Sequence, residues 1–104
     1  MGLFSLLMGL GCESIDTTEL KEKKGRKEDF FLLDVRTPSE FQRRKIDGAK
    51  LIPLGELDAR VKEVPKNKDV VVYCATGLRS AFACRKLKSL GFRVKNLAGG
   101  ISQW

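Results

Sequence analysis

A regular alternation of strand-like and helical segments, which begins at Asp16, constrains the fold of this chain more than any other feature. The mostly apolar run 30–35 and the valine-rich run 69–73 have the composition of strands buried on both faces. Each is followed by a helical pattern, a capping box with proline at 37–40 and an apolar stripe over 80–90. The alternation predicts an α/β fold, in which a parallel sheet is flanked by helices on both faces.

The length of the chain, 104 residues, leaves room for one domain. We expect this domain to span residues 12–104, with the apolar segment 1–11 as an N-terminal tail. The tail has no lysine or arginine, which a secretory signal peptide would carry. No run approaches the roughly 20 apolar residues that a membrane-spanning helix needs, so we expect no membrane span.

Histidine is absent from the chain, and its absence argues against two common classes of site. Hydrolases of the triad type use an imidazole base, and most zinc sites use an imidazole nitrogen. The three cysteines, Cys12, Cys74 and Cys84, are odd in number and form no C-x-x-C pair, which favours neither a disulfide framework nor a metal site. We therefore expect no metal, a reducing cytoplasm, and Cys84 as a chemically quiet core residue.

The connection between the valine-rich strand and the next helix is the strongest candidate for a chemical site. It starts with Cys74 and runs through Gly77 and Arg79 into the helix. The backbone N–H groups of residues 75–79 can converge on the Cys74 sulfur, since Gly77 permits backbone angles that other residues resist. These groups, the helix N-terminus and the Arg79 guanidinium all stabilise negative charge. We expect a thiolate nucleophile, with a thiol pKa well below its free value of about 8.5.

Four segments resemble, in the correct order, the signatures of the rhodanese-like sulfurtransferases. They are Leu33-Asp-Val-Arg36 with Glu40-Phe41, the segment 47–53, the loop 74–80 and the C-terminal segment 91–104. The resemblance implies a five-stranded parallel sheet with the active site at the Cys74 loop. It also implies transfer of a sulfane sulfur from an anionic donor such as thiosulfate to a thiophilic acceptor, cyanide or a thiol, through a Cys74 persulfide. That reaction needs no metal or organic cofactor.

The resemblance also implies roles for single residues. Cys74 is the catalytic nucleophile, and the residues after it cradle the substrate and the persulfide: Ala75, Thr76, Gly77, Leu78 and Arg79, with Ser80 at the helix N-terminus. A structural signature, which pairs charges to fix the turn after the first strand, comprises Asp34, Arg36 and Glu40. Lys45 stands where many relatives have histidine, and Ala75 lacks the basic side chain of some thiosulfate-using members.

Other functions remain open on the sequence. A cysteine phosphatase or an arsenate reductase has the same kind of anion-binding loop, with five residues between cysteine and arginine where this chain has four. A non-enzymatic interaction module or a sulfur carrier is also compatible, because a net charge of +7 and an outward-facing Phe82 beside the loop suit an acidic donor protein. Basic residues are dispersed and no aromatic stacking platform accompanies them, so we expect no nucleic-acid partner.

Overall fold

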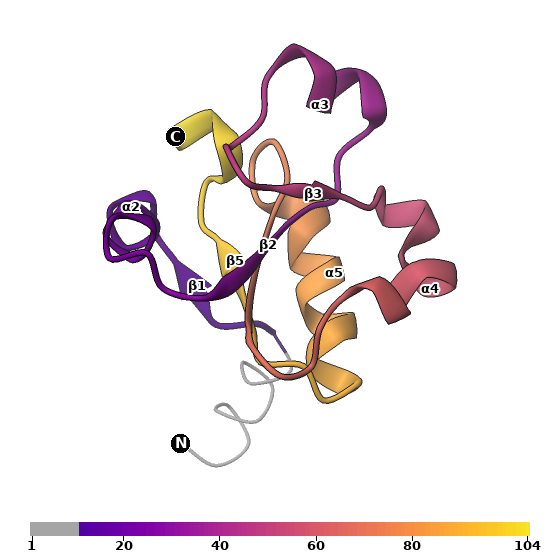
Figure 1. Ribbon diagram of the computed structural model, residues 1–104. Helices are drawn as coiled ribbons and strands as arrows, with labels where there is room; N and C mark the ends of the chain where they lie inside the picture. The colour runs from indigo at the N-terminus through magenta and orange to yellow at the C-terminus, as the bar shows by residue number, and fades with distance from the viewer. Residues whose placement is uncertain (1–10) are drawn as a thin grey trace.

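The computed structural model describes residues 11–104 and contains a five-stranded parallel sheet in the order β1-β5-β4-β2-β3 (Figure 1). All four strand pairings are parallel, which confirms the predicted fold class. The predicted tail lies outside the described residues except for Gly11. The strands are β1 (Ser14–Ile15), β2 (Phe30–Asp34), β3 (Lys50–Leu51), β4 (Asp69–Tyr73) and β5 (Val94–Leu97).

Helices cover both faces of the sheet, with α4 and α5 on the face opposite α2 (Figure 1). The helices are α2 (Thr17–Gly25), α3 (Pro38–Arg43), α4 (Leu57–Arg60) and α5 (Leu78–Ser89), with short 3-10 turns η1 (Leu54–Glu56), η2 (Val61–Glu63) and η3 (Gly100–Gln103). Among the described residues no helix is long and apolar enough to cross a membrane.

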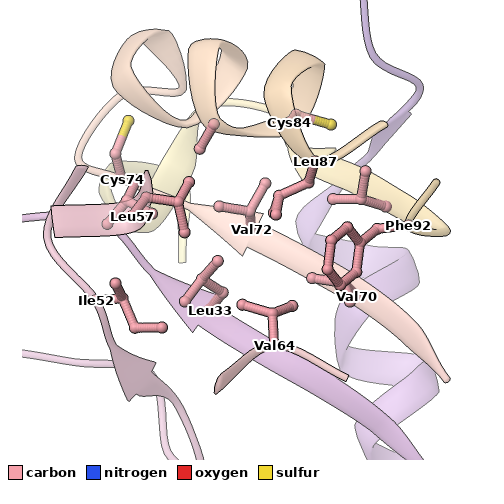
Figure 2. Close-up of a cluster of buried hydrophobic side chains, with 13 residues drawn as sticks. Leu33, Ile52, Leu57, Val64, Val70, Val72, Cys74, Cys84, Leu87 and Phe92 are labelled. Atoms are coloured by element: carbon pink, nitrogen blue, oxygen red, sulfur yellow. The ribbon is translucent and has the colours of Figure 1, made fainter. Parts of the chain in front are cut away.

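Strand β4 divides its side chains between two hydrophobic clusters, one on each face of the sheet. Val70 and Val72 pack toward α5 with Leu87, and Figure 2 shows this cluster between the sheet and the helix. Val71 and Tyr73 pack on the opposite face, toward α2. Because both sets are almost fully buried, the central strand reads as a continuous apolar run rather than an alternating one.

Helix α5 begins two residues earlier than the stripe over 80–90 predicts. Gly77 has φ 105° and caps the helix in the left-handed conformation, so the first helical turn already contains Leu78 and Arg79. The helix ends at Ser89, before Gly91 at φ 94°. The loop between Cys74 and the helix is therefore shorter than the sequence pattern indicates.

The carboxyl ends of three strands meet at one edge of the sheet. Asp34 at the end of β2 pairs with Tyr73 at the end of β4, and Val72 pairs with Asn96 near the end of β5. Parallel α/β sheets place their functional loops at this edge. The segments that follow these strands are therefore neighbours around Cys74.

Two of the three cysteines form a disulfide, which corrects the expectation that none is paired. Cys12, which precedes β1, is bonded to Cys84 on α5, and their Cα atoms are 5.7 Å apart. Cys84 is fully buried, as predicted, but it is not a free thiol. The sequence spacing of 72 residues did not reveal the pair, because the contact depends on β1 adding to the sheet beside β5 beneath α5. Cys74 is left as the free cysteine.

Candidate active site

The loop after β4 surrounds the Cys74 sulfur with hydrogen-bond donors. The Gly77 backbone N–H donates to Sγ over 3.1 Å, and the Ser80 hydroxyl lies 3.3 Å from the same atom. The backbone N–H groups of Thr76 and Ser80 also act on the sulfur. The amides of this loop face inward, which is the arrangement of an anion-binding nest.

Two opposing effects set the acidity of the Cys74 thiol. Burial raises its pKa, while hydrogen bonds from the Ser80 hydroxyl and from the backbone N–H groups of Ser80, Gly77 and Thr76 lower it. The balance leaves the pKa below its ordinary value. The direction agrees with the sequence-based expectation. The largest lowering effects on this pKa come from the loop's own donors, and Arg79 and Cys74 also interact through their charges.

A buried asparagine, which the sequence reading missed, supports this loop from β5. The Ser80 hydroxyl lies 2.6 Å from Oδ1 of Asn96, and Nδ2 of Asn96 donates to the Gly77 carbonyl over 3.1 Å. A hydroxyl carries one proton, so Ser80 donates either to Asn96 or to the Cys74 sulfur. The signal for Asn96 was a polar residue at a position of β5 that alternation places on the same face as Val94, with the other polar residue of the strand, Lys95, exposed on the opposite face.

Arg79 is held by the carboxylate of Glu40. Its two terminal nitrogens donate to the two carboxylate oxygens of Glu40 over 2.8 and 2.9 Å. Hydrogen bonds from Arg79 and then from the Thr37 backbone lower the pKa of Glu40 to about 2, so the carboxylate is ionised at neutral pH. Glu40 also belongs to the capping box that starts α3. The pair therefore joins α3 to the first turn of α5.

The other two signature residues form a buried ion pair at the end of β2. Nη2 of Arg36 lies 2.7 Å from Oδ2 of Asp34, and the same nitrogen donates to the Arg44 carbonyl over 2.6 Å. The Arg36 backbone N–H donates to Asp34 as well, over 2.9 Å. These bonds fix the turn that leads into α3 and so set the position of Glu40. They do not bring Asp34 or Arg36 into hydrogen-bond contact with Cys74.

The C-terminal turn η3 donates hydrogen bonds to the backbone carbonyl groups of the loop. The N–H of Ile101 donates to the Cys74 carbonyl over 2.9 Å, and the N–H of Ser102 donates to the Ala75 carbonyl over 3.0 Å. Gly100 lies so close that an added Cβ would stand 2.5 Å from both carbonyl oxygens. With its carbonyls held by η3, the loop directs its N–H groups toward the sulfur.

The sulfur lies at the base of the loop, and exposed and partly exposed residues stand above it. Cys74 has only 1% of its surface exposed, but Leu78, the first residue of α5, has 71% exposed. In Figure 2 the Cys74 sulfur points away from the aliphatic side chains of the cluster and toward the start of α5. A reactant must therefore enter between the loop residues to reach it.

The Ser80→Ala substitution is expected to raise the pKa of the Cys74 thiol, because it removes a donor to the thiolate while burial stays. A hydrogen bond to a charged group contributes about 1.5 kcal/mol, so the rate of alkylation at neutral pH should fall by about tenfold. The measurement is the pH dependence of iodoacetamide alkylation. Ser89→Ala on the same helix is the control, since Ser89 donates only to the Lys86 carbonyl. Equal rates for both variants would contradict the role of Ser80.

Comparison with known proteins shows which family has this architecture. The family model of the rhodanese-like domain matches residues 16–104. A sulfurtransferase from Allochromatium vinosum is 42% identical over 91 residues, which cover 86% of this chain and 85% of that protein. A putative sulfur carrier protein, YrkF, from Bacillus subtilis is 35% identical over 86% of this chain and 49% of its own length.

Among solved structures, a rhodanese-related protein from Thermoplasma volcanium superposes with a TM-score of 0.82 at 35% identity, covering 88% of this chain and 89% of that chain. The family match, over residues 16–104, includes strands β2 to β5, the Cys74 loop and the C-terminal turn that binds it. From the five parallel strands, the cysteine loop and these matches together, we conclude that the chain belongs to the rhodanese-like domain family.

Proposed function

We propose that the protein is a sulfurtransferase that moves a sulfane sulfur from an anionic donor such as thiosulfate to a thiophilic acceptor, cyanide or a thiol, through a persulfide on Cys74. The supporting observation is the environment of the Cys74 sulfur. The sulfur accepts a hydrogen bond from the Gly77 N–H over 3.1 Å and lies 3.3 Å from the Ser80 hydroxyl. Such donors stabilise a thiolate, and later a persulfide anion, without reorganisation. The sulfurtransferase from A. vinosum supports the same reaction class.

The proposed reaction has two displacements at sulfur. The Cys74 thiolate attacks the outer sulfur of thiosulfate, an S–S bond forms, and the bond from that sulfur to the sulfonate group breaks as sulfite leaves. The acceptor thiolate or cyanide then attacks the outer sulfur of the persulfide, and Cys74 leaves as a thiolate. No base has to remove a proton from Cys74 when the thiol is already ionised, so the reaction does not depend on histidine.

Mass analysis tests the proposal directly. The intact chain is incubated with thiosulfate and, separately, with glutathione persulfide, and then digested to map the modified peptide. We expect one added sulfur, in the peptide that contains Cys74. A chain that stays unmodified with both donors would overturn the proposed function, whereas modification by the persulfide alone would exclude only thiosulfate as donor.

We further propose that Arg79 binds the anionic donor, so the Glu40→Gln substitution is expected to lower KM for thiosulfate. Glutamine can keep the capping contact with the Thr37 backbone but removes the charge that occupies the guanidinium. If the freed Arg79 gains an interaction of about 1.4 kcal/mol with thiosulfate, KM falls about tenfold, and kcat changes less.

The control for this prediction is Glu63→Gln. Glu63 pairs with Arg60 and Lys50 on the surface, and hydrogen bonds from these two residues also lower its pKa to about 2. Steady-state kinetics with thiosulfate and cyanide distinguish the variants. An unchanged or higher KM in Glu40→Gln would show that Arg79 does not bind the donor and only holds α3 in place through Glu40.

A sulfur carrier is the second candidate function. It is favoured by the relative named as a putative sulfur carrier and by the Glu40 contact that occupies Arg79, the cation expected to bind a small anion. A carrier would exchange sulfur faster with a protein persulfide than with thiosulfate. Comparing the two rates on the same chain separates the candidates.

Cellular location stays a prediction. The odd cysteine count favours the cytoplasm, where thiols are kept reduced. The Cys12–Cys84 disulfide weighs against that prediction. Trapping the thiols of freshly lysed cells with a maleimide would report the redox state of this pair.

A further inference from the structure

Two large apolar side chains are exposed next to the Cys74 loop. Leu78 has 71% of its surface exposed and Phe82 has 56%, and the two lie one turn apart on α5. The guanidinium of Arg85 stands over the Phe82 ring, 4.7 Å from its centroid. We call Leu78, Phe82 and Arg85 the α5 ridge. Exposed apolar side chains that gather beside a reactive group mark an interaction surface more often than scattered ones do.

The charge around the ridge is positive. No ion pair among the described residues engages Arg85 or Arg44. Arg44 donates to the Ile101 carbonyl over 3.3 Å, and the N–H of Ile101 is bonded to the Cys74 carbonyl. Cations therefore flank the loop on the η3 side as well as on α5. The carboxylate of Glu40, which lies at the same end of the molecule, is occupied by Arg79.

Because Cys74 is buried, the two steps of the reaction can accept reactants of different size. Loading requires contact with Sγ itself, in a residue that is only 1% exposed, which suits a small donor. Unloading requires contact only with the added sulfur, which extends one S–S bond, about 2 Å, beyond Sγ. A thiol on a larger molecule can therefore meet the outer sulfur while the rest of that molecule rests on the α5 ridge.

We propose that the α5 ridge docks an acidic acceptor protein, which presents a cysteine to the Cys74 persulfide. This inference rests on the proposed function. The acceptor thiolate attacks the outer sulfur, a new S–S bond forms, the bond to Cys74 breaks, and Cys74 leaves as a thiolate. Phe82 and Leu78 supply apolar contact, and Arg85 and Arg44 attract carboxylates of the partner.

Synthetic peptides test the docking without a known partner. The first contains one cysteine, two leucines and several glutamates, and the second has glutamine in place of every glutamate. A thiosulfate-loaded chain should pass its sulfur to the acidic peptide about tenfold faster than to the glutamine peptide at low salt. The difference should vanish at high salt, because surface charges are then screened.

Variants locate the contact. Phe82→Ala should slow transfer to the acidic peptide by about tenfold and leave transfer to 2-mercaptoethanol unchanged. Leu90→Ala is the matched control, since Leu90 is also exposed, at 42%, but lies at the far end of α5. Equal transfer rates in the parent and Phe82→Ala, or an equal loss in Leu90→Ala, would overturn the docking site.

A binding experiment keeps the inference separate from the chemistry. A form of the acidic peptide with serine in place of cysteine is titrated into unloaded protein and followed by amide chemical shifts in NMR spectra. We expect shifts at residues 78–85 that Phe82→Ala weakens. Absence of binding would refute the docking surface even if Cys74 accepts sulfur, whereas binding without loading would refute the proposed function alone.

Discussion

The Cys74→Ser variant is expected to gain no sulfur from any donor and to lose sulfurtransferase turnover entirely. A serine hydroxyl can accept the same hydrogen bonds from the loop, but it is not ionised near neutral pH and forms no persulfide. The fold should survive, because the change replaces one small atom and keeps the contacts with Gly77 and Ser80. Intact-mass analysis after incubation with thiosulfate measures the loading.

Thermal melting is the companion measurement for this variant. A change of about 1 kcal/mol shifts the melting temperature of a domain of this size by roughly 4–8 °C, so a larger fall would point to a structural effect. Sulfur found on Cys12 or Cys84 of the variant would contradict the assignment of Cys74 as the nucleophile. Those cysteines are bonded to each other, so we expect neither to be modified under non-reducing conditions.

The Gly100→Ala substitution is expected to cause the largest loss of stability at the site. Gly100 has φ +60°, and a Cβ there would lie 2.5 Å from the carbonyl oxygens of Cys74 and Ala75, which are backbone atoms that cannot rotate away. The left-handed conformation costs alanine about 1–2 kcal/mol, and the forced shift of the loop costs a further 1–3 kcal/mol, roughly. A sum of about 3 kcal/mol corresponds to a melting temperature lower by roughly 12 °C or more.

Activity should fall with it, because the loop and η3 share two hydrogen bonds that the added methyl group would separate. The control is Gly25→Ala in the last turn of α2, where nothing lies within 4 Å of the added Cβ. That variant should keep its stability within about 1 kcal/mol. Melting curves and sulfur loading that are alike for the two variants would show that the C-terminal turn does not hold the loop.

The parts of the structure that could be predicted from the sequence are those with local causes. The valine-rich run formed β4, and the capping box at Thr37 started α3 with the hydrogen bonds expected of it. The order of strand, cysteine, glycine and helix correctly predicted where the loop begins, although α5 starts two residues earlier than predicted. Each of these depends on residues a few positions apart, so hydrophobic pattern and turn chemistry were sufficient.

The contacts that were missed join residues far apart in the chain. Glu40 meets Arg79 across 39 positions, Asn96 meets Ser80 across 16, and Cys12 meets Cys84 across 72. Each depends on which strands are neighbours and in what register, and a single sequence does not state either. The charge distribution of the site therefore differs from the one that the sequence predicts. Arg79, the cation expected to bind the donor, is already paired with Glu40.

The two outermost strands, β1 and β3, are each only two residues long. An exposed strand edge invites pairing with another chain, and very short edge strands are one way in which natural proteins discourage it. The edges of this sheet therefore offer very few backbone hydrogen-bonding groups with which another chain could extend the sheet. We expect the protein to resist fibrillar self-assembly when concentrated, and to meet other macromolecules through its side chains.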